Sequence, residues 1–399
     1  MGKRAGLILA LILVVAACTD SQTGTDTTPV SVTELVESDG GRLVVLDDTG
    51  NVVVMAPDGS ERIALTDDGG DGVAYSQPIW SPAGDQIVFG EATPEGFGVQ
   101  IQGADGSGAV DVPMSGLPFY TFWSPTGETI GALHNGSDGL DFEMIDVASE
   151  TATVVATGSP FYFSWDPAGA TVITHVGENR FETLDPVGAK AKFGETDAGY
   201  LAPQWTPGGV VHVTGGDLVI QGVGDEPAAI VEVAGFTPFV VNPQGTRVAL
   251  QTFGDDGALS VALKEVVSVS SDRLLVVDVE TGDVEVVDPR PAISFFWSPN
   301  GESLLFLTPT EALDGLEVGV WSTAGAVESH GIFNPSPAVL TGLIPFFPQY
   351  AQSMSFWAPD SSAFALPGDI EGEEGIWVFG LDGGEPRLVA EGSWVSWSR

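Results

Sequence analysis

A five-residue pattern, Trp-x-Pro-x-Gly, recurs along most of the chain and constrains its fold more than any other feature. From Trp80 to Trp397 there are seven intervals with a mean of about 45 residues. A repeat of this length is typical of propeller blades of four strands. The clear copies begin at Trp80, Trp123, Trp165, Trp205 and Trp297, degenerate copies begin at Val241 and Trp357, and the chain ends inside an eighth copy at Trp397.

The residue types of the pattern suit a strand that ends in a tight turn. Each Trp closes a short apolar or aromatic run, such as residues 118–123, which favours a buried strand and can fill the gap between neighbouring sheets. Pro then ends the strand because it lacks an N–H donor, and the Gly allows the chain to reverse. A new strand, such as residues 86–89, follows at once.

A second set of eight turns, from Pro57-Asp58-Gly59 to Leu381-Asp382-Gly383, counts the repeats independently. The first of these turns has no Trp motif before it, and the last Trp motif has no strands after it. We therefore expect Trp394 to Arg399 to supply the missing strand of the blade that begins at Arg42, which leaves no exposed sheet edge. The predicted fold is all-β, an eight-bladed propeller closed by its N- and C-terminal strands, with seven blades as the alternative.

A run ending in Trp-Ser-Pro-x-Gly, followed by an apolar strand and later by an Asp-Gly turn, resembles the TolB-like (PD40, WD40-like) β-propeller repeat. The resemblance spans residues 42 to 399 and implies the architecture without implying an activity. Two features differ from relatives with such propellers. TolB carries an α/β domain ahead of its propeller, and prolyl oligopeptidases add a hydrolase, whereas here a short polar segment precedes the first strand and no Gly-x-Ser-x-Gly motif is present.

The first residues predict export and lipid attachment. Lys3 and Arg4 precede an apolar stretch from Ala5 to Ala17, which is too short to span a bilayer and is typical of a signal peptide. Val15-Ala16-Ala17-Cys18 resembles the bacterial lipobox, whose cysteine receives a diacylglycerol. We therefore predict a signal peptide over residues 1–17, a lipidated Cys18 with a flexible polar tether over residues 18–37, and the propeller over residues 38–399.

Charge and cysteine content narrow the range of partners. The chain has 13 Lys and Arg against 55 Asp and Glu, a formal net charge of −42. Nucleic acids and anionic lipid surfaces attract basic proteins, so this composition argues against both as partners. Cys18 is the only cysteine, which excludes an internal disulfide. The expected location is the outer face of the cell membrane, or the periplasmic leaflet of an outer membrane where one exists.

The longer connections between strands are expected on one face of the ring. In a four-stranded meander the first-to-second and third-to-fourth turns share one face, and here these turns are tight. The opposite face then receives the longer segments, which are residues 67–72, 254–270, 308–315, 334–350 and 367–375. Loops of this length are usually functional or mobile.

The segment 343–350, Leu-Ile-Pro-Phe-Phe-Pro-Gln-Tyr, is the most apolar of these connections. Exposed apolar surface in a loop commonly marks a partner site. We therefore predict that Leu343, Phe346, Phe347 and Tyr350 bind a protein partner or an envelope component. The alternative is that Phe346 and Phe347 fold back to cap the propeller.

Metal and catalytic motifs are weak. His134, His175 and His212 fall on second strands of consecutive repeats, but their offsets from the preceding turn differ, which favours separate packed histidines over a metal site. Asp67, Asp68 and Asp71 form a Gly-rich loop that is a weak Ca²⁺ candidate, because it lacks the full calcium-loop pattern. No cofactor and no catalytic residues are predicted.

The sequence thus favours a non-enzymatic binding or scaffold lipoprotein that uses its loop-rich face. Two alternatives stay open. A propeller enzyme of the hydrolase or lactonase type would need acids or histidines that converge in the central channel. A small-molecule or sugar receptor would need aromatic side chains around a pocket.

Overall fold

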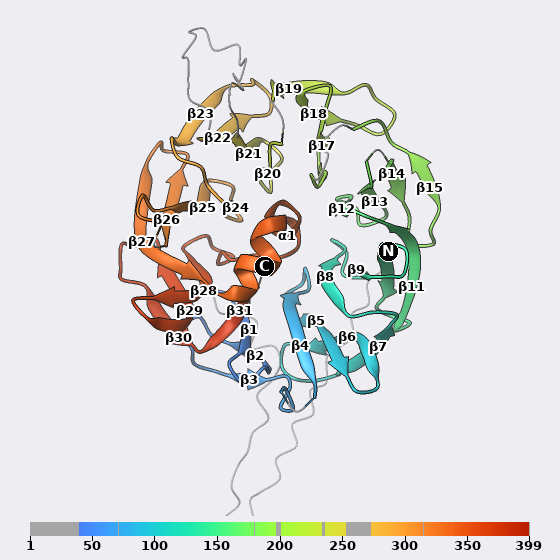
Figure 1. The fold of residues 1–399 in the computed structure, drawn as a ribbon, viewed down its shortest axis with the longest axis vertical. Coiled ribbons are helices and arrows are strands. Elements are labelled where there is room, and N and C mark those ends of the chain that lie inside the picture. Colours follow the sequence, from blue (N-terminus) through green and yellow to red (C-terminus); the bar gives the residue numbers. More distant parts are fainter. Residues whose placement is uncertain are drawn as a thin grey trace, which may run out of the picture. The chain divides into compact units, whose positions relative to one another are not determined.

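The computed structural model describes residues 40–70, 72–178, 180–196, 201–233, 236–252, 273–313 and 315–398. Cys18, the predicted signal peptide and the predicted tether lie outside the described residues. Ser38–Arg399 group into one compact unit. Within it, sheets are arranged around a centre in the order of the sequence (Figure 1).

The first half of the ring consists of antiparallel sheets of four strands, and within each sheet consecutive strand numbers rise from the centre outward (Figure 1). The closing sheet contains β1 (Leu43–Asp47), β2 (Val52–Met55) and β3 (Ile63–Ala64). The next three contain β4 (Ala74–Trp80), β5 (Gln86–Thr93), β6 (Gly96–Gly103) and β7 (Val110–Met114); β8 (Pro118–Trp123), β9 (Thr129–Asn135), β10 (Leu140–Asp146) and β11 (Thr151–Gly158); and β12 (Phe161–Trp165), β13 (Val172–Val176), β14 (Arg180–Leu184) and β15 (Lys190–Lys192).

The second half continues the pattern. Two more four-stranded sheets contain β16 (Gln204–Thr206), β17 (Gly209–Thr214), β18 (Asp217–Gln221) and β19 (Ala228–Glu232); and β20 (Phe239–Val241), β21 (Arg247–Thr252), β22 (Arg273–Asp278) and β23 (Val284–Asp288). A seven-stranded sheet contains β24 (Ser294–Trp297), β25 (Ser303–Pro309), β26 (Leu316–Ser322), β27 (Val327–Pro335), β28 (Ala363–Ile370), β29 (Glu373–Gly380) and β30 (Arg387–Ala390). The all-β propeller architecture is therefore confirmed.

The last strand closes the ring. β31 (Gly392–Trp397) pairs antiparallel with β1, with Leu43 opposite Trp397 and Val45 opposite Val395. The predicted closure of one blade by the two ends of the propeller is confirmed. Just before β1, the carbonyl oxygen of Gly40 accepts a hydrogen bond from the indole N–H of Trp397 at 2.9 Å.

The seven-stranded sheet holds two repeat units. β27 joins β28 only through the pairs Asn334–Asp369 and Pro335–Gly368. Trp357 forms an isolated antiparallel bridge to Phe364, which places the degenerate motif at the inner edge of β28. The described strands therefore form seven sheets but eight repeat units.

Tryptophan side chains join neighbouring repeat units at their inner strands. The indole N–H groups of four motif tryptophans each donate to the carbonyl oxygen of the residue that precedes the motif position in the previous unit. These bonds run from Trp80 to Ser396 (3.1 Å), from Trp165 to Phe122 (3.1 Å), from Trp297 to Val240 (2.9 Å) and from Trp357 to Phe296 (3.0 Å). A buried indole N–H needs such an acceptor, so the motif supplies both the packing and the polar partner between sheets.

The motif glycine has a backbone conformation that other residues rarely adopt. Gly84, Gly127, Gly169, Gly245 and Gly301 have φ between 67° and 73°, in the left-handed region. In the degenerate copy, Ser361 occupies this position with φ of 62°. Six of the seven described copies therefore share this left-handed geometry, whereas Gly209, in the copy that begins at Trp205, has φ of 135°.

The connection between β27 and Trp357 is helical. It contains a π-helical turn η2 (Val339–Leu343), a 3₁₀ turn η3 (Ile344–Phe346) and the helix α1 (Phe347–Ser353). Figure 1 shows α1 at the centre of the ring, and it contacts the inner strands β8, β12, β20 and β24. We call α1 the central helix. The expectation of a long loop at residues 367–375 was wrong, because these residues belong to the hairpin of β28 and β29.

Candidate functional site

The central helix is held by Gln349, whose side chain completes the inner edge of β12. Its Oε1 accepts from the N–H of Phe163 at 3.1 Å, and its Nε2 donates to the carbonyl oxygen of Phe163 at 2.6 Å. Nε2 also donates to the hydroxyl of Tyr120 at 2.9 Å, and that hydroxyl donates to the backbone carbonyl of Gln349 at 3.0 Å. An edge strand leaves backbone groups without partners, and this amide satisfies one such pair.

Tyr350, the next residue, ties the helix to two other inner strands. Its hydroxyl donates to the carbonyl oxygen of Phe119 at 2.7 Å and accepts from the amide of Gln77 at 2.9 Å. Burial raises the pKa of this phenol above its ordinary value. Gln77 has φ of 48° and lies in an irregularity of β4, so the strand bends where it meets the helix.

The four residues predicted to bind a partner are not equally accessible. Leu343, Phe347 and Tyr350 are buried, with exposed fractions of 5% or less, whereas Phe346 is 49% exposed. Phe347 packs edge-on against Phe295, with ring centroids 4.7 Å apart. The buried three fasten the segment to the propeller, as the capping alternative expected for Phe347, and Phe346 is the one of the four that remains available to a partner.

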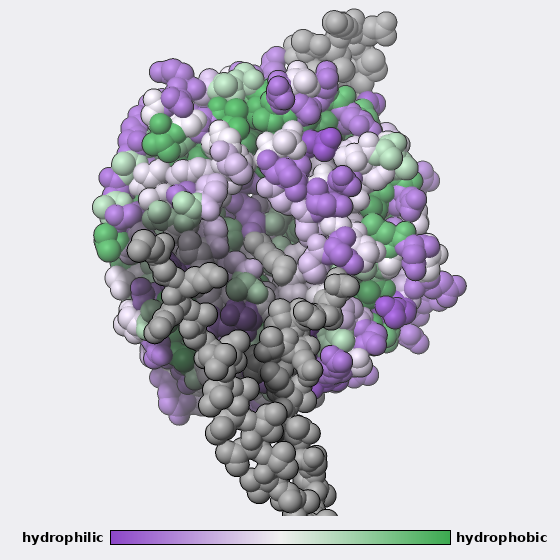
Figure 2. All heavy atoms as spheres, turned by 180° about the vertical axis from the view of Figure 1, so that it is seen from behind, coloured by the Kyte–Doolittle hydropathy of each residue, from purple (hydrophilic) through white to green (hydrophobic). Residues whose placement is uncertain are grey.

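A cavity of about 280 Å³ lies beside Phe346, and we call it the Phe346 pocket. It is bordered by connections that lead from the outer strand of one sheet to the inner strand of the next. Its other apolar walls include Phe236, Pro238, Ile293 and Ile344. Phe236 is also about half exposed. On the face shown in Figure 2, hydrophilic residues dominate and hydrophobic ones form small separate groups.

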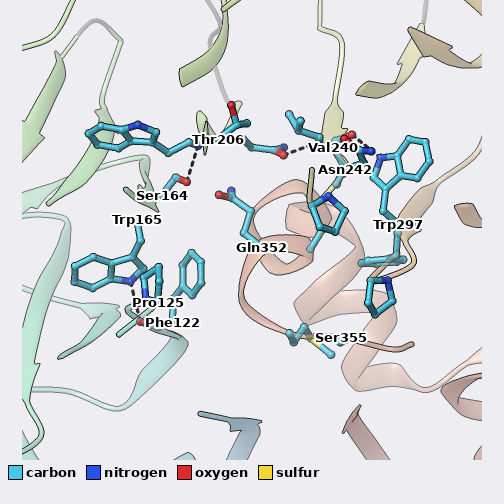
Figure 3. Close-up of a pocket in the computed structure, with 18 of the residues that line it drawn as sticks. Phe122, Pro125, Ser164, Trp165, Thr206, Val240, Asn242, Trp297, Gln352 and Ser355 are labelled. Carbon is cyan, nitrogen blue, oxygen red and sulfur yellow. Dashed lines mark hydrogen bonds between the residues drawn. The ribbon is translucent and has the colours of Figure 1, made fainter. Parts of the chain in front are cut away.

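A larger cavity of about 540 Å³ lies on the other side of the central helix, and we call it the Trp-Pro cavity. Its wall is built from the Trp-x-Pro-x-Gly turns, and its floor includes Ala351, Gln352 and Met354. Figure 3 shows Gln352 projecting from the helix toward the inner strands β12 and β16, which carry Ser164 and Thr206. The central helix thus separates two cavities that open on opposite faces of the propeller.

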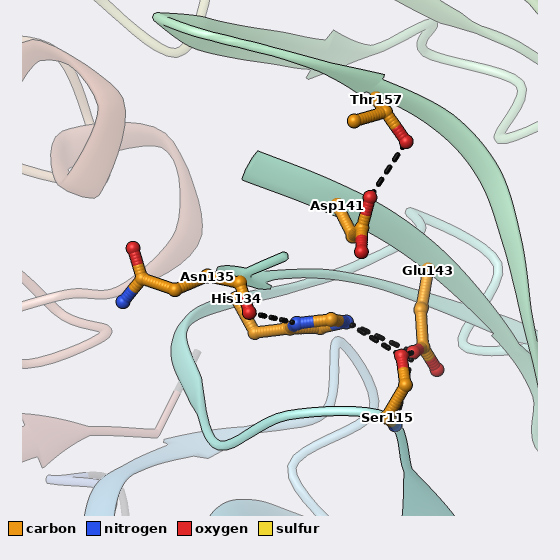
Figure 4. A network of polar contacts seen from close by, with 6 residues as sticks. All are labelled: Ser115, His134, Asn135, Asp141, Glu143 and Thr157. Atoms are coloured by element: carbon orange, nitrogen blue, oxygen red, sulfur yellow. Dashed lines mark hydrogen bonds and ion pairs between the residues drawn. The ribbon is translucent and has the colours of Figure 1, made fainter. Parts of the chain in front are cut away.

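His134 belongs to a buried polar network between β9 and β10 (Figure 4). Its Nε2 lies 2.9 Å from Oε1 of Glu143, and its Nδ1 lies 3.1 Å from the carbonyl oxygen of Asn135. The hydroxyl of Ser115 donates to the same Glu143 oxygen and lies 3.1 Å from Nε2. In a nucleophilic triad the serine and the acid contact opposite ring nitrogens, whereas here both contact Nε2. The network therefore fastens the chain at Ser115 to the sheet.

The other two histidines have separate partners. Nδ1 of His175 lies 3.0 Å from the carbonyl oxygen of Leu201, and Nε2 of His212 lies 3.0 Å from Oε1 of Gln221. Burial lowers the pKa of His175, which keeps it neutral. Within the described part of the chain, no three His, Cys, Asp or Glu side chains lie together as a metal-binding group.

The weak calcium candidate is only partly described. Asp68 accepts a hydrogen bond from the hydroxyl of Tyr75 at 2.7 Å, and burial together with this bond raises the pKa of Tyr75. Asp71 lies outside the described residues. The loop 67–72 stays a prediction as a calcium site.

Sequence reasoning missed Gln349, Gln77 and Glu143. The available signal for Gln349 was an uncharged polar residue inside an apolar, proline-rich connection. Glu143 gave a weaker signal, a carboxylate between the apolar residues Phe142 and Met144 of β10. In both cases the partner lies on another strand, so the sequence spacing does not reveal the pair.

Comparison with solved structures shows which architecture these features belong to. A eukaryotic initiation factor matches with a TM-score of 0.54 and 11% identity, covering 90% of this chain and 98% of that one. An oligogalacturonate lyase in complex with manganese matches with a TM-score of 0.52 and 14% identity, covering 86% and 98%. The shared fold is the β-propeller. TolB from Acinetobacter baumannii also matches, with a TM-score of 0.41, 14% identity and coverage of 73% of this chain and 66% of TolB.

At these identities the β-propeller fold is what the matches share, and the expected β-propeller architecture is confirmed. No protein-family model matches the propeller chain, and no curated protein matches it. The function proposed for this chain therefore depends on the residues around the central helix.

Proposed function

We propose that the chain is an extracytoplasmic, lipid-anchored binding protein whose Phe346 pocket receives an apolar side chain of a protein partner. The observation that most supports this proposal is the exposure of Phe346. This side chain is half exposed at the edge of an apolar cavity, while its neighbours Leu343, Phe347 and Tyr350 hold its segment in place. A fixed apolar side chain beside a preformed pocket loses little conformational freedom on binding.

Membrane attachment in this proposal depends on the N-terminal segment. The apolar stretch before Cys18 and the polar residues after it support export and lipid modification. In the described residues, no helix is long and apolar enough to cross a membrane. The excess of acidic residues supports a protein or envelope component over nucleic acid as partner.

Partner binding is tested by affinity capture from the native envelope. We expect proteins retained by the wild-type chain to be lost with Phe346→Ser, because a hydroxyl cannot replace the buried apolar contact at the centre of an interface. Val187→Ser is the matched control, since Val187 is exposed but borders neither cavity. Equal retention by all three chains would exclude the pocket, and quantitative mass spectrometry of the captured proteins gives the measurement.

Lipid attachment is tested by Cys18→Ser. We expect the wild-type protein in the membrane fraction and the variant in the soluble extracytoplasmic fraction, because the serine cannot receive the thioether-linked lipid. Incorporation of labelled palmitate into wild type but not the variant measures this directly. Membrane retention of Cys18→Ser without label in either chain would contradict the lipid anchor.

Among the alternatives, the enzyme would require ionisable groups in the central cavities. The described residues that line the Trp-Pro cavity and the Phe346 pocket include no Asp, Glu, His, Lys or Arg. Aromatic side chains do line the Trp-Pro cavity, which favours the small-molecule receptor as the second candidate.

A further inference from the structure

Most of the side chains that line the Trp-Pro cavity are apolar. Among the residues that line it are seven prolines, five tryptophans and three phenylalanines. The prolines come from all seven Trp-x-Pro-x-Gly turns or their degenerate copies, from Pro82 to Pro359, so they surround the opening. The cavity volume of about 540 Å³ lies within the range of small-molecule sites in proteins.

The polar side chains in these walls are mostly engaged with the protein itself. The amide of Gln204 donates to the carbonyl oxygen of Phe239 at 2.7 Å and accepts from the N–H of Val241 at 2.8 Å. Oδ1 of Asn242 accepts from two backbone N–H groups of the following turn. The walls therefore present apolar carbon more than free hydrogen-bonding groups.

Gln352 projects from the central helix into the cavity (Figure 3). Its Nε2 donates to two backbone carbonyl oxygens, of Pro348 at 3.2 Å and of Pro203 at 3.4 Å. Gln352 is therefore also engaged with the protein.

The described lining of the Trp-Pro cavity has no charged side chain, which disfavours a charged ligand. A charged ligand would lose its hydration in this cavity without meeting an opposite charge from the described lining, and burial of an unpaired charge is strongly unfavourable. Anions are also repelled by the net charge of −42. Sugars would leave most of their hydroxyl groups without partners against proline and tryptophan.

We propose that the Trp-Pro cavity binds a small, uncharged and predominantly apolar molecule. This site is separate from the Phe346 pocket, because the central helix lies between them. Binding in the Trp-Pro cavity requires neither lipid attachment nor a protein partner.

The test uses the purified chain without residues 1–18, which removes the apolar stretch and the predicted lipidation site, so that neither lipid nor detergent competes for the ligand. The probe is N-phenyl-1-naphthylamine, an uncharged apolar fluorophore. Because five tryptophans line the cavity, binding is followed by energy transfer from tryptophan to the probe. We expect saturable binding at one site. Absence of saturable binding would overturn the proposal.

Two variants locate the bound probe. Ala351→Phe adds a ring at the cavity floor without removing a polar group, and we expect it to raise the Kd at least tenfold. Leu340→Phe adds the same ring at an exposed position that lines neither cavity, and the Kd should stay within twofold. Loss of binding with Phe346→Ser but not with Ala351→Phe would place the probe in the Phe346 pocket and overturn the assignment.

Competition then identifies the chemistry. Displacement by dodecanol would indicate an aliphatic ligand, and displacement by indole an aromatic one, and either result supports an uncharged apolar site. Displacement by maltose alone would contradict the proposal and favour a sugar. Laurate that competes as well as dodecanol would show that the cavity does not exclude charge.

Discussion

Gln349→Leu is expected to lower the free energy of unfolding by about 2–6 kcal/mol, because it leaves two buried backbone groups of Phe163 without partners and each costs about 1–3 kcal/mol. Gln349 is 4% exposed, so water cannot easily replace its amide. Leucine has nearly the same size, which keeps the packing change small. Chemical denaturation of wild type and variant measures the difference.

The matched control is Gln352→Leu, the same substitution three residues further along the central helix. Gln352 is only partly buried and its hydrogen bonds are long, at 3.2 and 3.4 Å. We expect a loss below about 1 kcal/mol, in line with an amide that water can reach. Equal effects of the two substitutions would show that the contact with β12 does not fasten the central helix.

Trp397→Ala is expected to cost about 3–5 kcal/mol, the range for removing a large buried aromatic side chain. Trp397 is 2% exposed, lies opposite Leu43 in the closing sheet and donates its indole N–H to Gly40. Its loss therefore weakens the only strand pair that joins the two ends of the described propeller. The expected readout is a lower denaturation midpoint together with faster proteolysis near residue 42.

Trp205→Ala provides the comparison. Trp205 occupies the same motif position but is partly exposed and lies in the middle of the ring. We expect a smaller loss, about half that of Trp397→Ala, because less apolar surface leaves a buried environment. If the two variants lost equal stability, ring closure would contribute nothing beyond the local packing of one tryptophan.

The repeating sheets could be predicted because their signals are local. In the segment around Trp123, an apolar run, a proline without a donor and a glycine at φ of 73° act within a few residues of one another. Closure by Trp397 followed from the same logic, since an incomplete first repeat and an incomplete last repeat leave one strand each to be paired. Such patterns need no knowledge of distant contacts.

The central helix could not be predicted in this way. Residues 343–350 contain Pro345 and Pro348 and have little helical tendency alone. Their conformation depends on hydrogen bonds to residues 186 to 273 positions away, at Phe163, Tyr120 and Gln77. The sequence marked the segment as an apolar connection of interest, but it did not distinguish Phe346, which is exposed, from Phe347, which is buried.

The sequence by itself determined the all-β ring, the position of its closing strands and the motif that joins its sheets, because turn geometry and strand patterning act over a few residues. Only the tertiary structure decided that one connection fills the centre and divides it into the Trp-Pro cavity and the Phe346 pocket. The physical reason is that the unpaired inner edges of β8 and β12 exist only once the ring has formed, and the amide of Gln349 and the hydroxyl of Tyr350 then satisfy them.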